Sequence, residues 1–219
     1  MNTQTTRQPV DTVIWDFNGT LLDDLDLTVE TINVVLTEHG VAPVDTHRHK
    51  RAFRFPIIEY YRDLGLDTSD AAFSVVTERY HDLYMQRVTE CSLYDGIPGV
   101  LDAIEQRGLR QFVLSALNQT LLDECIDGLG LRERFHGVYG LSDIMGRSKI
   151  ARGHDLVSDH GIDPARVLYI GDTIHDVEVA AALGFSAIAV SWGHQHTHMF
   201  DGHGATVARD PAEILTCLN

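Results

Sequence analysis

Two short stretches of the sequence combine carboxylates with residues that form turns. In DFNGT, Asp16 follows a run of apolar residues and stands two positions before Asn18. In GDTIHD, Asp172 and Asp176 are four positions apart. Carboxylate and carbonyl oxygens are the ligands that Mg²⁺ prefers, usually together with water and a phosphate group. Because a carboxylate can also attack phosphorus and form an aspartyl phosphate, these stretches predict phosphoryl chemistry with Mg²⁺ as the cofactor.

Other polar residues have the right chemistry to hold a phosphoryl group, namely Thr20, Ser115, Asn118 and Lys149. The hydroxyl of Ser115 and the ammonium of Lys149 can stabilise the charge that spreads over the phosphate oxygens. Lys149 can also offset the repulsion between Asp16 and an incoming anion. Each residue alone has an ordinary structural explanation, since Asp and Gly form turns and Ser caps helices. The prediction of a site therefore depends on their order along the chain and their placement on successive elements.

The elements that must position these residues can be read from short apolar runs. Buried strands are predicted at TVIWD (12–16), QFVLSA (111–116), GVYGL (137–141), RVLYIGD (166–172) and SAIAVSW (186–192). Helical patterns lie near 97–107, 119–129, 149–160 and 174–183. Strands that alternate with helices predict an α/β fold with a doubly wound parallel sheet. Ligands of such sheets bind at the carboxyl ends of the strands, where the candidate residues stand.

Residues 23–91 break this alternation. They contain no convincing strand, and LTVETINVVLTEHG and FSVVTERYHDLYMQRV both space their apolar residues like helices. The simplest organisation is a disordered tail at 1–10, an α/β core formed by 11–22 and 92–219, and a helical cap inserted after the first strand at 23–91. The alternative is one continuous fold with several extra helices.

Composition narrows the range of partners. The formal net charge of −15 argues against a general affinity for nucleic acid or an anionic membrane. No stretch approaches the roughly 20 apolar residues that span a bilayer, and MNTQTTRQP lacks the apolar region of a signal peptide. The cysteines, Cys91, Cys125 and Cys217, form no CxxC pair, so we expect reduced thiols. We expect a cytoplasmic monomer or homodimer whose partner is a small phosphorylated metabolite.

The motifs, taken in order, resemble those of the haloacid dehalogenase superfamily of hydrolases. They are DFNGTLL, the FVLS that ends at Ser115, RSKIARG around Lys149, and GDTIHD. The resemblance covers nearly the whole chain from residue 11 onward and points to the phosphoglycolate-phosphatase-like branch, which carries a helical cap. It implies a Rossmann-like core in which Ser115 and Lys149 grip the phosphoryl group. It also implies that 23–91 is a mobile cap that closes over the substrate and excludes water.

The resemblance assigns the metal site as well. It implies that Asp16 is both the nucleophile and a ligand of Mg²⁺. The backbone carbonyl of Asn18 and the carboxylate of Asp172 would be further ligands. Asp176 would act directly or through a water molecule.

Asn18 departs from the family pattern, in which an Asp at this position protonates the leaving group and then activates water. An amide cannot exchange a proton near neutral pH. General acid–base help is typically worth 10²–10⁴-fold in rate. WDFNGTLLDD, GDTIHDVEVA and WGHQ together resemble a sub-branch of phosphatases that carry Asn here.

Three explanations of Asn18 remain open at this point. Another group could supply the proton, first among them His175, followed by His194, His196, Asp23 or Asp24. The substrate could have a good leaving group that needs no acid. Finally, hydrolysis could be so slow that the protein is a transferase or a phospho-ligand-binding protein.

Two further segments of the sequence concentrate basic residues or histidines. HRHKRAFRFP (47–56) is basic, and within it Arg54 is the first choice for contact with an anionic substrate. The alternative is a solvated helix face. The alternating histidines of WGHQHTHMFDGHG (192–204) lack a matched second set of metal ligands, so we expect this segment to follow the last strand and lie near the site.

The sequence thus predicts a Mg²⁺-dependent phosphatase that forms an aspartyl phosphate at Asp16. Its substrate would be a sugar phosphate, phosphoglycolate or a nucleoside monophosphate. The alternatives are a phosphoryl transferase or phosphomutase of the same fold, an enzyme that cleaves a C–P or C–halogen bond, and a low-turnover phospho-ligand-binding protein.

Overall fold

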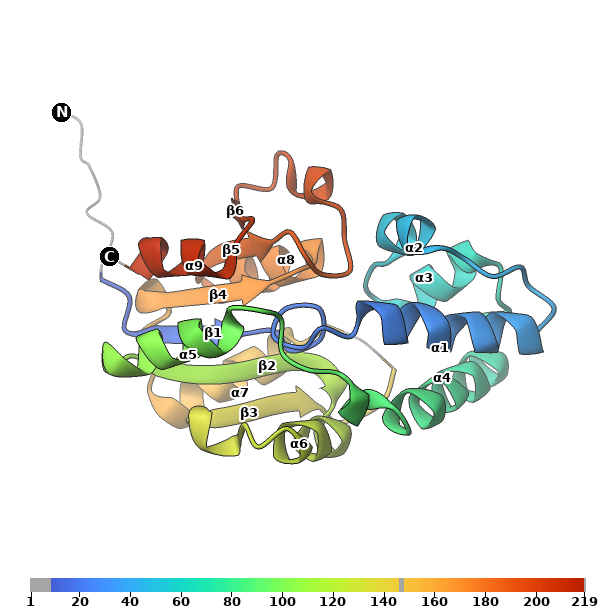
Figure 1. The fold of residues 1–219 in the computed structure, drawn as a ribbon, viewed down its shortest axis with the longest axis horizontal. Helices are drawn as coiled ribbons and strands as arrows, with labels where there is room; N and C mark the ends of the chain where they lie inside the picture. Colours follow the sequence, from blue (N-terminus) through green and yellow to red (C-terminus); the bar gives the residue numbers. More distant parts are fainter. Residues whose placement is uncertain (1–8, 146–147, 219) are drawn as a thin grey trace.

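The protein, represented by a computed structural model that describes residues 9–145 and 148–218, is built on a parallel sheet (Figure 1). Its order is β3-β2-β1-β4-β5-β6, with β1 in the middle. The strands are β1 (Thr12–Trp15), β2 (Arg110–Asn118), β3 (Gly137–Leu141), β4 (Val167–Gly171), β5 (Ser186–Val190) and β6 (Thr206–Ala208). The predicted α/β fold and its first five strands are confirmed. The edge strand β6 was not predicted, because three residues are too few to show an alternating pattern.

Alternation along the strands divides the core between the two faces of the sheet. Val13 and Trp15 pack on one side with α5 (Ile97–Gln106), α6 (Gln119–Gly128) and α9 (Pro211–Ile214). Ile14 packs on the other side with α7 (Ile150–His160) and α8 (Ile174–Leu183). Because successive side chains of a strand point to opposite faces, a strand that is buried on both faces must be apolar throughout. β1 has this pattern, and it ends directly before Asp16.

Four helices lie between β1 and β2 in the chain: α1 (Leu25–Glu38), α2 (Thr46–Ala52), α3 (Ile57–Leu64) and α4 (Asp70–Met85). They share an apolar cluster that includes Ile32, Leu36, Tyr60, Leu64, Phe73 and Val76. Figure 1 shows them as a group beyond the carboxyl ends of the strands, on the right of the view. These helices occupy the segment that the sequence predicts as a cap, whereas its motion as a separate unit stays a prediction.

The packed chain begins earlier than the predicted boundary at residue 11. Of the predicted tail, residues 1–8 lie outside the described part of the chain. Val10 is already buried, and Arg166 donates from Nε to the Pro9 carbonyl over 3.2 Å. Arg166 also pairs with Asp11 at 2.9 Å. Among the described residues, no helix is both long and apolar enough to cross a membrane.

Candidate active site

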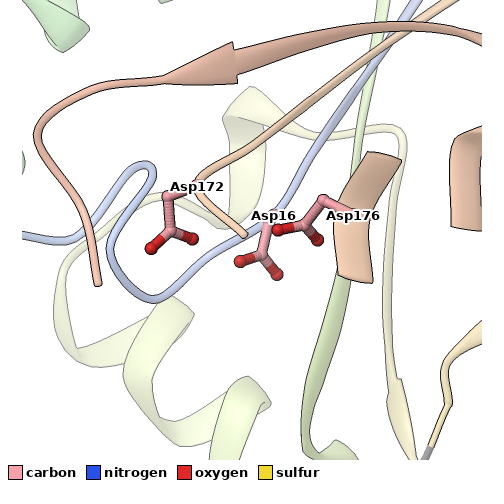
Figure 2. Close-up of side chains that lie close together, drawn as sticks. All are labelled: Asp16, Asp172 and Asp176. Carbon is pink, nitrogen blue, oxygen red and sulfur yellow. The ribbon is translucent and has the colours of Figure 1, made fainter. Parts of the chain in front are cut away.

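Carboxylates from three places in the chain meet at the carboxyl end of the sheet (Figure 2). Asp16 follows β1, Asp172 follows β4, and Asp176 lies in the first turn of α8. One oxygen from each lies within 4.8 Å of the others, and all three side chains are buried. β1 and β4 are hydrogen-bonded neighbours, so their carboxyl ends are necessarily adjacent.

This ligand set fits a hard divalent cation, because all of its donors are oxygens. Burial raises the pKa of Asp16 well above its ordinary range, although Lys149 opposes the shift. Burial also raises the pKa of Asp172 to about 6. Both shifts reflect the free-energy cost of concentrating negative charge in a buried site, which a bound cation would offset.

Lys149 supplies positive charge to the same cluster. Its Nζ lies 2.6 Å from Oδ1 of Asp16 and 2.7 Å from Oδ1 of Asp176, and donates to the Leu114 carbonyl over 3.2 Å. The three donors of an ammonium therefore all have acceptors. Burial would lower the pKa of Lys149, but the two carboxylates raise it above its usual value. Lys149 thus stays charged, beside the predicted nucleophile.

Asp176 is held by the chain itself. Its Oδ2 accepts from the backbone N of Thr173 over 2.9 Å and from the Thr173 hydroxyl over 2.6 Å, in a capping box at the start of α8. Its Oδ1 accepts from the Tyr169 hydroxyl over 3.1 Å as well as from Lys149. A carboxylate has about four lone-pair sites. These donors engage both oxygens of Asp176, which therefore holds Lys149 beside Asp16 in this arrangement.

Asp172 is enclosed by two loops. The Thr20 hydroxyl donates to Oδ1 over 3.2 Å, and the backbone N of His194 donates to Oδ2 over 2.6 Å. A Cβ at Gly193 would lie 2.3 Å from this Oδ2, and one at Gly19, whose φ is +72°, would lie 2.4 Å from it. Only residues without a Cβ permit the loops after β1 and β5 to approach so closely. Thr20, predicted as a phosphate ligand, is fully buried and positions Asp172.

The Asn18 amide is fixed by a buried carboxylate. Its Nδ2 donates to Oδ2 of Asp24 over 3.0 Å and to the Tyr84 hydroxyl over 2.7 Å. Oδ1 of Asp24 accepts from the backbone N of Gly19 over 2.8 Å and faces Nε2 of His194 at 3.2 Å. Both N–H donors of Asn18 are therefore occupied. A side chain in this state has no proton to give and no free donor for a leaving group.

A chain of buried rings continues from Asp24 into the helical segment. Nδ1 of His194 lies 3.1 Å from Nε2 of His49 in α2, whose Nδ1 lies 2.7 Å from the hydroxyl of Tyr60 in α3. Burial would lower the pKa of His194, but Asp24 raises it above its usual value. Burial lowers the pKa of His49 well below its usual value, and the charge of His194 lowers it further. The proton therefore resides on His194, which donates to both neighbours.

The WGHQ segment makes two further contacts with α2 and the residue after it. Gln195 donates from Nε2 to the Phe53 carbonyl over 2.6 Å, and Lys50 donates from Nζ to the Trp192 carbonyl over 3.3 Å. The sequence placed this segment near the site, which the structure confirms. The sequence did not predict that the segment is bonded to α2 and to the residue after it.

The structure places several predicted residues outside the cavity that adjoins the carboxylate cluster. The His175 ring packs beside Phe55 with centroids 5.0 Å apart. Burial and then Lys149 lower the pKa of His175 to about 4, so near neutral pH it is a neutral imidazole and not the imidazolium that a general acid requires. The Asn118 side chain caps α6 by accepting from the backbone N of Thr120 over 3.0 Å. Neither His175 nor Asn118 lines the cavity described next.

Arg54 also lies outside that cavity. Its guanidinium pairs with Asp63 at 2.7 Å, and about half of its side chain is exposed. The aromatic residues on either side of it, Phe53 and Phe55, do reach the cavity. The predicted anion contact is therefore paired within the chain in this conformation.

A cavity of about 110 Å³ lies between the helices α1 to α4 and the carboxylate cluster. Its polar end contains Asp16, Asn18, Ser115 and Asp172. The rest of its wall is mostly apolar and includes Phe53, Phe55, Ile57, Tyr60, Tyr61, Tyr80, Tyr84, Leu117 and Ile144. Nothing in a helical spacing separates a core aromatic residue from one that lines a cavity, so the sequence does not single out Tyr60 and Tyr61.

Known proteins share both the sequence and the fold. A family model described as haloacid dehalogenase-like hydrolase matches residues 13–190. N-acetylmuramic acid 6-phosphate phosphatase from Pseudomonas aeruginosa is 31% identical over 222 residues, which cover 97% of this chain and 96% of that protein. Phosphoglycolate phosphatase from Synechococcus elongatus is 27% identical over 207 residues, covering 93% and 91%.

A solved structure extends the likeness to three dimensions. A haloacid dehalogenase-like family hydrolase from Streptococcus pneumoniae aligns with a TM-score of 0.83 over 96% of this chain and 99% of that one. At 21% identity this comparison concerns the fold alone. With a family model that matches most of the sequence and a relative above 30% identity along nearly its whole length, the chain belongs to the haloacid dehalogenase-like hydrolases.

Proposed function

We propose that the protein is a Mg²⁺-dependent phosphatase that hydrolyses the phosphate monoester of a small metabolite through an aspartyl phosphate on Asp16. The observation that carries this proposal is the buried Asp16 carboxylate, which is bonded to Lys149, faces the cavity and lies beside Asp172. Two relatives are named as phosphatases of a sugar phosphate and of phosphoglycolate, which supports the same class of reaction.

In the proposed first step, an oxygen of Asp16 attacks phosphorus. A bond forms between that oxygen and phosphorus, the ester P–O bond breaks, and its electron pair leaves with the alcohol oxygen. Lys149 holds Oδ1 of Asp16 at 2.6 Å, which directs the other oxygen toward the substrate. The Ser115 hydroxyl lines the same cavity and is placed to bond a phosphate oxygen.

In the second step, water attacks the phosphorus of the aspartyl phosphate. A bond forms between the water oxygen and phosphorus, the bond between phosphorus and the Asp16 oxygen breaks with its electron pair on Asp16, and the water gives its proton to the departing phosphate or to solvent. Inorganic phosphate leaves, and the Asp16 carboxylate is restored. Asp16, Asp172 and the backbone carbonyl of Asn18 would hold Mg²⁺, while Asp176 would orient Lys149. When bound, the ion neutralises charge on the phosphate oxygens. The helices α1 to α4 would act as the cap that keeps bulk water away from the phosphoryl group.

The test is phosphate release from a panel of metabolite phosphates in the presence of Mg²⁺. Asp16→Asn should abolish release, and its fold can be verified by circular dichroism. Asp201→Asn, which changes an exposed carboxylate in the same way, is the matched control and should retain activity. Equal phosphate release by wild type and Asp16→Asn would contradict the proposal.

Asn18 favours a second candidate, phosphoryl transfer. Because its amide cannot take a proton from water, the aspartyl phosphate would persist, and an alcohol could then compete as the acceptor. Adding an alcohol such as glycerol to the assay distinguishes the two reactions. A transferase forms the phosphorylated alcohol faster than inorganic phosphate, whereas a phosphatase forms mainly inorganic phosphate.

A further inference from the structure

We infer that the preferred substrates are phosphate monoesters of phenols, in which an aromatic ring carries the ester oxygen directly. This inference rests on the proposed phosphatase function and specifies its substrate class. Two independent observations carry it. The first is the wall of the cavity, and the second is the state of Asn18.

The cavity wall matches a flat apolar ring. Aromatic side chains reach the cavity from α3, α4 and the turn after α2: Phe53, Phe55, Tyr60, Tyr61, Tyr80 and Tyr84. Phe53 and Tyr60 meet at 69° with centroids 5.2 Å apart, and Tyr80 stacks on Tyr84 at 5.9 Å. Aromatic rings favour such edge and stacked neighbours. The volume of about 110 Å³ is of the same order as the roughly 150 Å³ of an apolar cavity that binds benzene.

The same wall offers little to a second anion or to sugar hydroxyls. Among the described residues that line the cavity there is no Lys or Arg. Two histidines do line it, but His194 is already bonded to Asp24 and His49, and Nδ1 of His81 is bonded to the Thr77 carbonyl. Lys149, just behind the wall, is already bonded to two carboxylates. The hydroxyls of three of the lining tyrosines are bonded to other side chains, namely Tyr60 to His49, Tyr80 to Thr28 and Tyr84 to Asp24. A carboxylate or several hydroxyls of a substrate would therefore lose water without gaining partners.

With Asn18 at this position, the rate at which the ester P–O bond breaks depends on how stable the leaving oxyanion is. Both of its N–H donors are bonded to Asp24 and Tyr84, and the ring nitrogens of the neighbouring His194 are bonded to Asp24 and His49, so neither residue has a free N–H for the departing oxygen. A phenol such as that of tyrosine has a pKa of about 10. Water, which an alkyl alcohol resembles, has a pKa far above that of a phenol. When Asp16 bonds to phosphorus and the P–O bond breaks, a phenolate can leave with the electron pair and take its proton from solvent afterwards.

The experiment compares kcat/KM for phenyl phosphate and benzyl phosphate, which present the same ring but have phenolic and alkyl leaving groups. kcat/KM is the right quantity because it reports the steps up to the first irreversible one, the formation of aspartyl phosphate. Phosphoglycolate, a sugar 6-phosphate and a nucleoside monophosphate are assayed in parallel. Phenyl phosphate should exceed benzyl phosphate by about 10²-fold or more, the range that a missing general acid predicts. It should also exceed the three metabolites.

Two substitutions test the role of Asn18 and the role of the aromatic cavity wall separately. Asn18→Asp restores a group that can donate a proton, so it should raise kcat/KM for benzyl phosphate and narrow the difference between the esters. Phe55→Ala should raise KM for both aromatic esters, whereas Val75→Ala, an exposed apolar residue outside the cavity, should not.

Equal kcat/KM for the phenyl and benzyl esters, or a higher value for any of the three metabolites, would overturn the inference while Asp16-dependent phosphate release upheld the proposed function. Failure of every substrate to exceed the Asp16→Asn background would instead overturn the proposed function, and the inference with it.

Discussion

Nε2 of His49 lies 3.1 Å from Nδ1 of His194, and this pair joins α2 to the loop that follows β5. His49 is fully buried, and His194 is nearly so. Because His194 holds the proton between Asp24 and His49, the pair works only while His49 remains neutral. We therefore expect the contact between α2 and the loop after β5 to depend on pH.

His49 should stabilise the protein more at neutral than at acidic pH. Its pKa in the folded state is lowered from about 6.5, so below pH 6.5 the unfolded state binds more protons than the folded state. The free-energy difference between wild type and His49→Gln should be largest near pH 7 to 8 and should shrink as the pH falls below 6.5. Urea unfolding at several pH values measures it. His203→Gln, an exposed replacement, is the control, and a His49 difference that grows on acidification would contradict the expectation.

Lys149→Met should destabilise the protein and remove its activity. The change leaves Asp16 and Asp176 buried without their cation, and breaking a buried ion pair typically costs about 3–5 kcal/mol in free energy of unfolding. Arg166→Met breaks the surface pair with Asp11 and should cost only about 1 kcal/mol or less. Urea unfolding without Mg²⁺ gives both values. Similar costs for the two variants would show that the buried pairs contribute no more than a surface pair.

Mg²⁺ should raise the melting temperature of the wild-type protein. A ligand that binds only the folded state stabilises it by about 2.7 kcal/mol at a hundred times its Kd. Asp172→Ala removes a predicted ligand and should abolish most of the shift. Differential scanning calorimetry with and without Mg²⁺ detects this without any assay of activity. A shift of the same size in Asp172→Ala would place the binding of Mg²⁺ elsewhere.

Gly193→Ala should weaken the response to Mg²⁺. The added Cβ would lie 2.3 Å from Oδ2 of Asp172 and 2.4 Å from the Gly19 carbonyl, so the loop or the carboxylate must move. We expect a higher Mg²⁺ concentration for half-maximal activity and a lower maximal rate. Gly99→Ala is the matched control, because a Cβ there meets nothing within 4 Å and Ala favours the helix. An unchanged Mg²⁺ dependence in Gly193→Ala would show that this loop does not set the position of Asp172.

The local sequence was sufficient to predict the parallel sheet and the carboxylate cluster at one end of the candidate site. The apolar runs that end in Asp16 and in GDTIHD predicted buried strands whose carboxyl ends carry acids, and parallel neighbours bring those ends together. The apolar pattern of the strands and the acidic residues at their ends were therefore enough to predict that the carboxylates converge. The same reasoning proposed Ser115 and Lys149, which the family motifs also contain; Lys149 is bonded to Asp16, and Ser115 lines the cavity.

Only the tertiary structure decided what surrounds Asn18. His49 stands among charged residues in the sequence, and no periodicity indicates that it is buried against His194, 145 positions away. The aromatic wall likewise depends on how α3 and α4 pack over the carboxyl ends of the strands. Local patterns encode which side of a helix is apolar, but they do not encode which other element that side meets. For this reason the first predicted donor, His175, and the predicted anion contact, Arg54, lie outside the cavity. Asp24, which the sequence named among the alternative donors, is instead bonded to Asn18 together with Tyr84.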